Sequence, residues 1–452
     1  MGFFNKKIKH QKSESSSFIM GVQDVFNLKD SQNLLVVGNM KGTVHVGDAV
    51  YISNPGTDDD GILLTTIDGI EIEPHINVRE ATDCHVALCV NNGRQHLIRK
   101  STVLFTRDRS VKDVHDTYIS VLGDAFVMKQ KLDLSDTELE TLTITDCAEI
   151  WRLFTWFHTK VIKDESEEIK KENHEKIDRL ASVLCKKIMQ AESIYCVFNK
   201  NTGEPHMFSR TIDQGDGTYI CSPPDIRIFT KAYESVMRNV FPEDTFEIRR
   251  IDNGENRDGI FDFFGSTFYL NGACGVEVIS EQTAINSSMF VAAPDYGSIA
   301  KQNIPVTNPD LMRWMLLIGQ LGQVQGEDGE LIYKLYYRFM SKEMVKANFL
   351  IPMQKEGDIP QPDENGMTVL KKDMILKFPT MDGKYGRSAV RMFTDWKRLR
   401  MVYDEGWDGM VQPIEGMIDS FDCAINATQY PQAGCYIGKE MFEEIKKCKS
   451  CD

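Results

Sequence analysis

The sequence has no motif that would bind a nucleotide phosphate. Both the Gly-x4-Gly-Lys-Ser/Thr loop and the Gly-x-Gly-x-x-Gly turn, which place backbone amides around phosphates, are missing. Near Lys384 the glycines have the wrong spacing, and the series Gly319, Gly322 and Gly326 lacks the lysine. We therefore expect neither a phosphate-loop NTPase nor a dinucleotide-dependent enzyme.

Histidine is missing from the second half of the chain. All nine histidines precede residue 207, so no Ser-His-Asp triad or Cys-His pair can be completed within that half alone. His45 and His85 lie on expected strands, where a structural role is favoured over metal ligation. The acidic triplet 58–60 lacks the spacing of a calcium loop. The sequence predicts no catalytic, cofactor-binding or metal-binding residue.

Signals for disulfides and membrane insertion are weak. The eleven cysteines are an odd number, and most lie beside apolar residues, which favours buried thiols in a reducing compartment. Cys448 and Cys451 have Cys-x-x-Cys spacing; we expect an unstructured tail there, with metal binding or oxidation as the alternative. No uncharged apolar run reaches the roughly 18 residues of a membrane span. These features predict a cytoplasmic protein without a membrane span.

Positive charge is in deficit, because 52 Lys+Arg face 67 Asp+Glu and the net charge is −15. Such a protein is not expected to bind nucleic acid or an anionic membrane over its whole surface. Residues 1–17 differ, since Lys6, Lys7, Lys9 and Lys12 make this segment a flexible basic tail.

The 452 residues correspond to roughly three domains at about 150 residues each. Within residues 18–92, short β-rich runs alternate with turn signals such as Gly47-Asp48 and Asp68-Gly69. The runs are 34–37, 49–52, 62–67 and 85–90. Strands of this length and spacing predict a small β-barrel.

Residues 93–171 change to helical spacing and predict a helical spacer followed by a charged linker. Helices are expected over 111–130 and 136–163, the second capped by Ser135 or Asp136. An aromatic stripe on the second helix is expected to face a core. The charge run 163–176 is expected to be a solvated linker or helix face.

Residues 172–290 and 305–447 follow one pattern and predict two tandem α/β modules in a multidomain α+β protein. In each, a helix runs into a strand: about 174–190 into 194–198, and about 329–345 into 350–353.

A tetrad also recurs in the two modules, as Arg227–Thr230 and Arg391–Thr394. Each tetrad opens an expected helix, with its threonine placed as an N-cap. The loop 356–366 is an insertion in the second copy.

The barrel segment contains Gly-Thr-Val-His-Val-Gly-Asp at 42–48 and Ala-Thr-Asp at 81–83. Over residues 18–92 it resembles the second domain of elongation factor Tu and its relatives, and Gly42 and Gly47 suit tight hairpins between its strands. The GTPase domain that precedes this barrel in translation factors has no counterpart here, so the resemblance implies no GTP hydrolysis.

The two repeats resemble the SseB-like (enhanced serine sensitivity) family. The residues that carry this resemblance are 347–353, 391–396 and 407–413 of the second copy. The first copy matches less well, because Lys231-Ala232 replaces Asp-Trp. The resemblance implies a cytoplasmic bacterial protein with no established catalytic residues, so none is assigned.

Three functions follow as expectations. The first is a non-catalytic binding or regulatory protein with a protein partner and no cofactor. The second is association with a ribosome or RNA through the barrel, whose few cations include Lys29 and Lys41. The third is an enzyme with a site in a cleft between the repeats.

Overall fold

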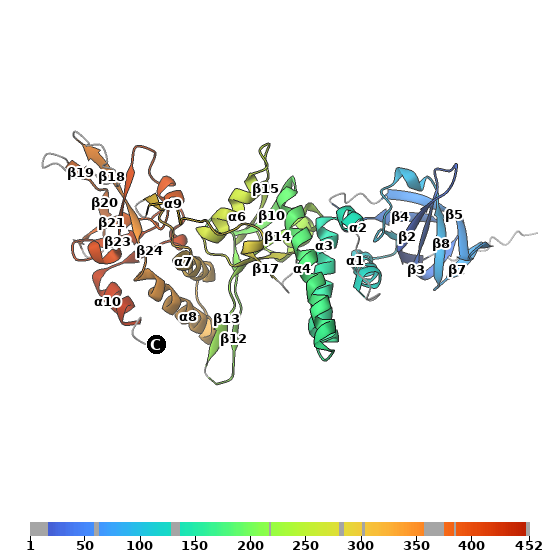
Figure 1. The fold of residues 1–452 in the computed structure, drawn as a ribbon, viewed down its shortest axis with the longest axis horizontal. Helices are drawn as coiled ribbons and strands as arrows, with labels where there is room; N and C mark the ends of the chain where they lie inside the picture. The colour runs from blue at the N-terminus through green and yellow to red at the C-terminus, as the bar shows by residue number, and fades with distance from the viewer. Residues whose placement is uncertain are drawn as a thin grey trace, which may run out of the picture. The chain divides into compact units, whose positions relative to one another are not determined.

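The computed structural model describes residues 17–57, 63–127, 136–216, 218–279, 284–300, 303–356, 375–383 and 386–448. The chain divides into two compact units, Met1–Leu184 and Cys185–Asp452, and the fold is mixed α+β (Figure 1). Across the described ranges, no helix combines the length and apolarity needed to cross a bilayer. The basic tail before Ser17, the acidic triplet 58–60, Ser135, Lys384, nearly all of the 356–366 insertion and Cys451, together with the Cys448 side chain, lie outside the described residues.

The first unit begins with a closed barrel of six antiparallel strands. Their order around the ring is β1 (Ser17–Gly21), β9 (Val103–Phe105), β4 (Ala49–Ser53), β5 (Leu63–Glu73), β8 (His85–Val90) and β3 (Leu34–His45). Pairing of β1 with β3 closes the ring. Alternate side chains fill its interior, as Val86, Leu88 and Val90 do on β8. The predicted barrel is confirmed as a β-barrel, and its strand β9 lies beyond residue 92, in the range assigned to the spacer.

Three short strands, β2 (Asp24–Asn27), β6 (Ile76–Val78) and β7 (Glu80–Thr82), extend the barrel edges. Two expected turns are wrong. Gly42, with φ of +91°, lies inside β3, where a Cβ atom would come within 2.0 Å of the Ser17 carbonyl oxygen. Asp68-Gly69 lies within β5, where the register against β8 shifts between Ile67 and Gly69. An extra residue there makes a bulge, which bends the strand without reversing it.

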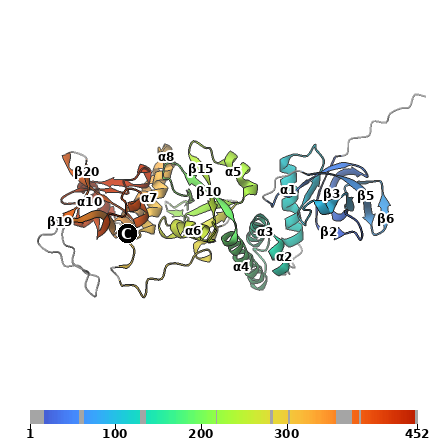
Figure 2. The same cartoon turned by 90° about the horizontal axis from the view of Figure 1, so that it is seen from above.

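Helices α1 (Val111–Leu122), α2 (Asp136–Thr141) and α3 (Ile144–Trp156) follow the barrel and lie together in Figure 2. The single helix expected over 136–163 is wrong, because Thr143 and Asp146 form a capping box that starts α3. Most of the aromatic stripe faces the core as predicted, with Trp151, Phe154 and Phe157 buried, but Trp156 is 48% exposed.

Asp146 also joins these helices to the barrel. Its side chain is fully buried and accepts hydrogen bonds from the Arg99 guanidinium and, at 2.8 Å, from the Tyr118 hydroxyl. Gly56 lies against this cluster, since a Cβ atom there would be 2.3 Å from Asp146 Oδ1. The barrel and helices are therefore packed as one body through a buried ion pair.

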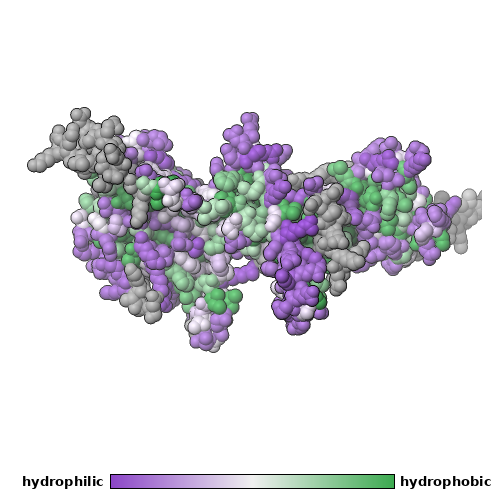
Figure 3. All heavy atoms as spheres, in the orientation of Figure 1, coloured by the Kyte–Doolittle hydropathy of each residue, from purple (hydrophilic) through white to green (hydrophobic). Residues whose placement is uncertain are grey.

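Helix α4 (Glu167–Gln190) contains most of the charge run as an exposed helix face, as predicted, and the face seen in Figure 3 is hydrophilic. It leads into copy 1, defined as residues 185–290. The sheet of copy 1 has the order β15 (Phe246–Asp252), β10 (Ser193–Asn199), β14 (Asp225–Phe229), β16 (Gly275–Val278) and β17 (Ala284–Asn286). Beside it lie β11 (Met207–Phe208), the hairpin β12 (Thr211–Asp213) and β13 (Tyr219–Cys221), and helices α5 (Glu234–Val240) and α6 (Gly259–Tyr269).

Copy 2, residues 305–447, repeats this strand order across two sheets that a single bridge connects. It runs from β22 (Asp408–Gln412) and β18 (Phe349–Glu356), across a Leu350–Phe393 bridge, to β21 (Ser388–Met392), β23 (Asp422–Ile425) and β24 (Cys435–Ile437). Its remaining elements are α7 (Pro309–Leu321), α8 (Gly326–Met344), β19 (Ile375–Lys377), β20 (Thr380–Asp382), α9 (Trp396–Arg400) and α10 (Lys439–Cys448). In both copies the central parallel pair is flanked by antiparallel partners.

The likeness of the copies extends to a strained backbone position. Ile279 after β16 and Asn426 after β23 both have positive φ, +70° and +49°. Each donates its backbone N–H at 2.8 Å to the neighbouring strand, at Ile228 and Met392 respectively. Isoleucine rarely adopts this conformation, so the turn geometry persists in copy 1 without a side chain that suits it.

The expected threonine N-cap is confirmed in position in copy 1, without a side-chain bond, and is wrong in copy 2. Thr230 precedes a 3₁₀ turn and makes no capping bond with its side chain. In copy 2 the cap of α9 is Asp395, whose carboxylate accepts the Arg398 N–H at 3.0 Å, while the Thr394 hydroxyl donates to Asp395. The carboxylate is the stronger acceptor and also pairs with the Arg398 side chain. This explains why Asp395, and not the Thr394 hydroxyl, caps α9.

Candidate functional site

A pocket of about 280 Å³ lies between copy 1 and the first two helices of copy 2. Copy 1 contributes residues from its β11 to β16 region, and copy 2 contributes α7 and α8. The lining residues are His206, Met207, Phe208, Ser209, Arg210, Arg227, Glu277, Leu317, Gln320, Leu321 and Tyr336. Neither copy alone would enclose this space.

A buried ion pair forms one wall of the pocket. Arg227 on β14 lies directly opposite Glu277 on the parallel strand β16. Its Nε and Nη2 atoms donate to Glu277 Oε2 at 3.1 and 2.8 Å, and its guanidinium stacks 4.4 Å from the centre of the Phe208 ring. The exposed Arg210 brings Nη2 to 3.6 Å from the other oxygen of Glu277. Two guanidinium groups therefore share one carboxylate.

Asp225 lies on β14 two residues before Arg227, so their side chains leave the same face of the strand. Burial, with a further contribution from the negative charge of Glu277, raises the pKa of Asp225 to about 7, and Arg210 opposes this rise. At neutral pH this carboxyl group is only partly ionised. It adds less negative charge beside the pocket than an exposed aspartate would.

His206 forms another part of the wall and is uncharged at neutral pH. Burial, followed by repulsion from Arg227, lowers its pKa to about 4. Its ring packs edge-on against Phe208 and Phe246, with centroids 4.7 and 4.9 Å away, and its Nδ1 atom is buried without a hydrogen-bond partner among the described residues. The Nδ1 atom is therefore not paired with a nucleophile as that of a general base would be.

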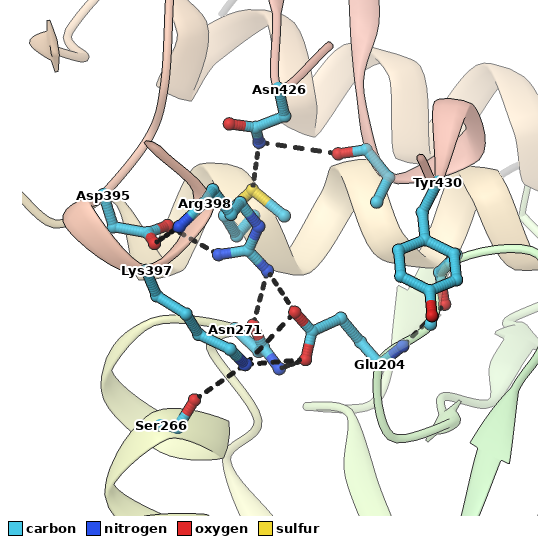
Figure 4. A network of polar contacts seen from close by, with 12 residues as sticks. Glu204, Ser266, Asn271, Asp395, Lys397, Arg398, Asn426 and Tyr430 are labelled. Carbon is cyan, nitrogen blue, oxygen red and sulfur yellow. Dashed lines mark hydrogen bonds and ion pairs between the residues drawn. The ribbon is translucent and has the colours of Figure 1, made fainter. Parts of the chain in front are cut away.

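A second polar cluster, which we call the junction, connects the two copies (Figure 4). Arg398 of copy 2 is 2% exposed and donates to Asp395 at 2.5 Å, to Glu204 at 3.1 Å and to Asn271 at 2.6 Å. Lys397 donates to the second oxygen of Glu204 at 3.1 Å. The carboxylate of copy 1 is thus held by two cations of copy 2, with its charge fully compensated.

The junction is close-packed as well as charged. Gly203, with φ of +70°, lies under the Tyr430 ring of copy 2, where a Cβ atom would come within 2.5 Å of the ring. On α7, Gln320 accepts the Met207 N–H at 3.2 Å. The turn that holds Glu204 in the junction therefore also holds His206, two residues later, in the pocket wall.

Metal ligation has no support in the described ranges, where no cluster of three His, Cys, Asp or Glu could hold an ion. Cys423 and Cys435 are close to each other on β23 and β24, but burial raises the pKa of both thiols to about 12. They are therefore protonated and poorly nucleophilic.

The histidines named from sequence both belong to the barrel. His45 lies 3.3 Å from Glu80 and 3.6 Å from Asp48, and His85 shares a hydrogen bond with Asn39. Lys29 is exposed, whereas Lys41 lines a cavity of about 260 Å³ between the barrel and α1. That cavity also carries Arg109 and three aspartates: Asp113, Asp116 and Asp124.

Sequence reasoning did not single out Asp225, Glu277 or His206. Arg227 was noticed only as part of the repeated tetrad. A usable signal was nevertheless present, because Asp225 and Arg227 alternate with Ile226 and Ile228, and Glu277 lies between two valines. Charged residues inside short apolar strands are buried and need partners.

Comparisons with known proteins give little that extends to the whole chain. No family model matches, and no curated protein matches. Among solved structures, translation elongation factor SelB from Methanococcus maripaludis is similar in its apo form and in its complex with the GTP analogue GppNHp. Each match has 22% identity and a TM-score of 0.17. Each covers 21% of this chain and 20% of the SelB chain, so this chain matches about a fifth of that protein's length.

Proposed function

We propose that this chain is a non-catalytic binding protein with a regulatory role, and that the pocket between the copies is its binding site. The observation that carries this proposal is the fixed ion pair in the pocket wall, in which Arg227 and Glu277 hold each other. Arg227 is bonded to Glu277, and His206 has no nucleophile on its buried nitrogen. A half-open pocket with a few fixed polar groups suits binding. Turnover requires an activated acid, base or nucleophile, and Asp225, whose pKa is raised to about 7, is not among the residues that line the pocket.

The finer assignment, to the SseB-like type, is part of the proposal. Its support is the identical strand order of the two copies, together with the tetrads at Arg227 and Arg391 that start at equivalent places on β14 and β21. A cytoplasmic location is also proposed, since the cysteines in the described ranges are free thiols.

For the barrel we propose a protein partner in preference to RNA. In its cavity beside α1, three aspartates outnumber Lys41 and Arg109, and this balance would repel a phosphate backbone. Ribosome co-sedimentation at low salt should therefore be absent. Co-sedimentation that weakens steeply as salt is raised would favour the RNA alternative.

The test of the binding function compares three full-length proteins purified from the native host. Leu321→Trp places a larger side chain at the half-buried end of α7 that lines the pocket, and Val411→Trp is a control at a half-exposed position on β22. Mass spectrometry of solvent extracts should find one molecule on the wild type and the control, and much less on Leu321→Trp. That molecule should be recovered unchanged after prolonged incubation with the protein. Its conversion to a product would show that the site is catalytic, and equal amounts on all three proteins would exclude the pocket.

A further inference from the structure

We infer that the pocket between the copies takes a small organic carboxylate, with the anionic head at Arg210 and the apolar body against α7. This inference rests on the proposed binding function and adds the chemical class of the ligand.

The charge of the pocket favours an anion. Among the described residues that line the pocket, Arg210 and Arg227 carry the positive charges and Glu277 carries the negative charge. The neighbouring Asp225 adds only part of a negative charge, because its pKa is raised to about 7. One positive charge is therefore incompletely compensated, and an amine placed here would be repelled.

Arg210 is the group that can reach the ligand. Its side chain is 59% exposed, and its separation of 3.6 Å from Glu277 is too long for a hydrogen bond. Arg227, in contrast, is held by Glu277 and Phe208. A planar guanidinium with available N–H groups binds a carboxylate through two parallel hydrogen bonds.

His206 contributes a neutral ring to the pocket wall, because its pKa is lowered to about 4. Its Nδ1 atom is enclosed by the protein and has no hydrogen-bond partner among the described residues, so it is not accessible to a ligand. The ring therefore adds no positive charge to that of Arg210.

The volume of the pocket and the residues opposite Arg210 indicate the size and the apolarity of the ligand body. Leu317 and Leu321 line the α7 side of the pocket and Phe208 lines the copy 1 side, so an apolar body is favoured over a second charged group. The volume of about 280 Å³ is near the lower end of the range for small-molecule pockets, roughly 300–1,000 Å³. A monocarboxylate of the size of butyrate or benzoate fits this space.

Three probes of one shape test the charge of the ligand. Benzoate, benzamide and benzylamine are titrated into the full-length protein by isothermal titration calorimetry at constant ionic strength, with butyrate and butyramide as an aliphatic pair. We expect the carboxylates to bind with a Kd on the order of 1 mM. The amides should bind at least about tenfold more weakly, because they lack the charge.

Arg210→Gln should weaken benzoate binding at least about tenfold. Arg250→Gln is the matched control, since Arg250 has a similar exposure, 54%, and pairs with Asp252 on β15 outside the pocket lining. Its affinity for benzoate should equal that of the wild type.

Equal binding of acid and amide, tighter binding of benzylamine, or no effect of Arg210→Gln would each overturn the carboxylate assignment. So would the absence of binding by both acids at several times the expected Kd. These results would leave the binding function standing as long as Leu321→Trp still removes the molecule retained by the wild type. If that loss also fails to occur, the binding function itself is wrong.

Discussion

The two copies share a strand order but place their ion pairs differently. In copy 1, Lys231 and Glu234 form a pair three residues apart at the start of a helix, with side chains 52% and 15% exposed. At the equivalent positions of copy 2, Asp395 and Arg398 form a pair of reversed charge whose side chains are 1% and 2% exposed. The buried pair reaches across to the other copy, where Arg398 binds Glu204.

On the central strands, the buried ion pair is in copy 1 and has no equivalent at the matching positions of copy 2. Arg227 of copy 1 faces Glu277 across the parallel pair, whereas the equivalent Arg391 faces Ala424 and bonds to the Tyr403 hydroxyl at 3.2 Å. Charged groups of copy 1 therefore form one wall of the pocket, whereas the two cations of the junction come from copy 2 and bind Glu204 of copy 1. The two copies differ in where their buried charges lie.

The largest predicted effect comes from Arg398→Met. Removing the guanidinium leaves Asp395 and Glu204 buried with less compensation, and loss of one partner of a buried pair costs about 3–5 kcal/mol. Urea unfolding of the full-length protein measures the loss. A change below about 1 kcal/mol would show that the junction is no stronger than a surface contact.

Asn426→Ala should have the next largest effect. The Asn426 side chain accepts from the Thr394 N–H at 3.0 Å, and its φ of +49° suits asparagine. Losing this buried bond and straining the turn should cost about 1–3 kcal/mol. The melting temperature of Asn426→Ala, measured by thermal unfolding, tests this loss of stability. Thr428→Ala in the following loop is the control, and its melting temperature should change less.

Asp225→Asn should change how stability depends on pH. Because the folded-state pKa of Asp225 is raised from 3.8 to about 7, the folded protein binds this proton more tightly than the unfolded chain. The wild type therefore loses stability as pH rises through that window. The variant should gain stability relative to the wild type over the same range. Urea unfolding at several pH values measures this difference, and a constant difference across the window would contradict it. The exposed Asp213→Asn is the control.

The smallest effect is expected for Lys231→Met, which removes the cation of the equivalent pair in copy 1. A half-exposed pair of this kind contributes about 0–1 kcal/mol. The loss of unfolding free energy in this variant is compared with the loss in Arg398→Met. The comparison tests whether burial, and not the spacing of the two residues in the sequence, determines how strongly each pair stabilises the protein. Equal losses for the two variants would contradict that explanation.

The sequence predicted much of the fold and little of the site. Barrel strands and the paired helix-to-strand segments follow from local apolar patterns, which burial on one face dictates. The junction could not be predicted, since Glu204 and Arg398 are almost two hundred residues apart and meet only through packing of the copies. Asp68-Gly69 was predicted as a turn from its local sequence. Its pairing with β8, which depends on residues distant in the sequence, keeps it within a strand.

The most direct test of this account is a crystal structure of the full-length protein soaked with 4-iodobenzoate, whose iodine gives an anomalous signal. The account predicts a peak in the pocket between the copies, with the carboxylate beside Arg210 and the iodine toward Leu317 and Leu321 on α7. A peak beside Arg391 in copy 2, or none in the pocket, would contradict this assignment of the binding site.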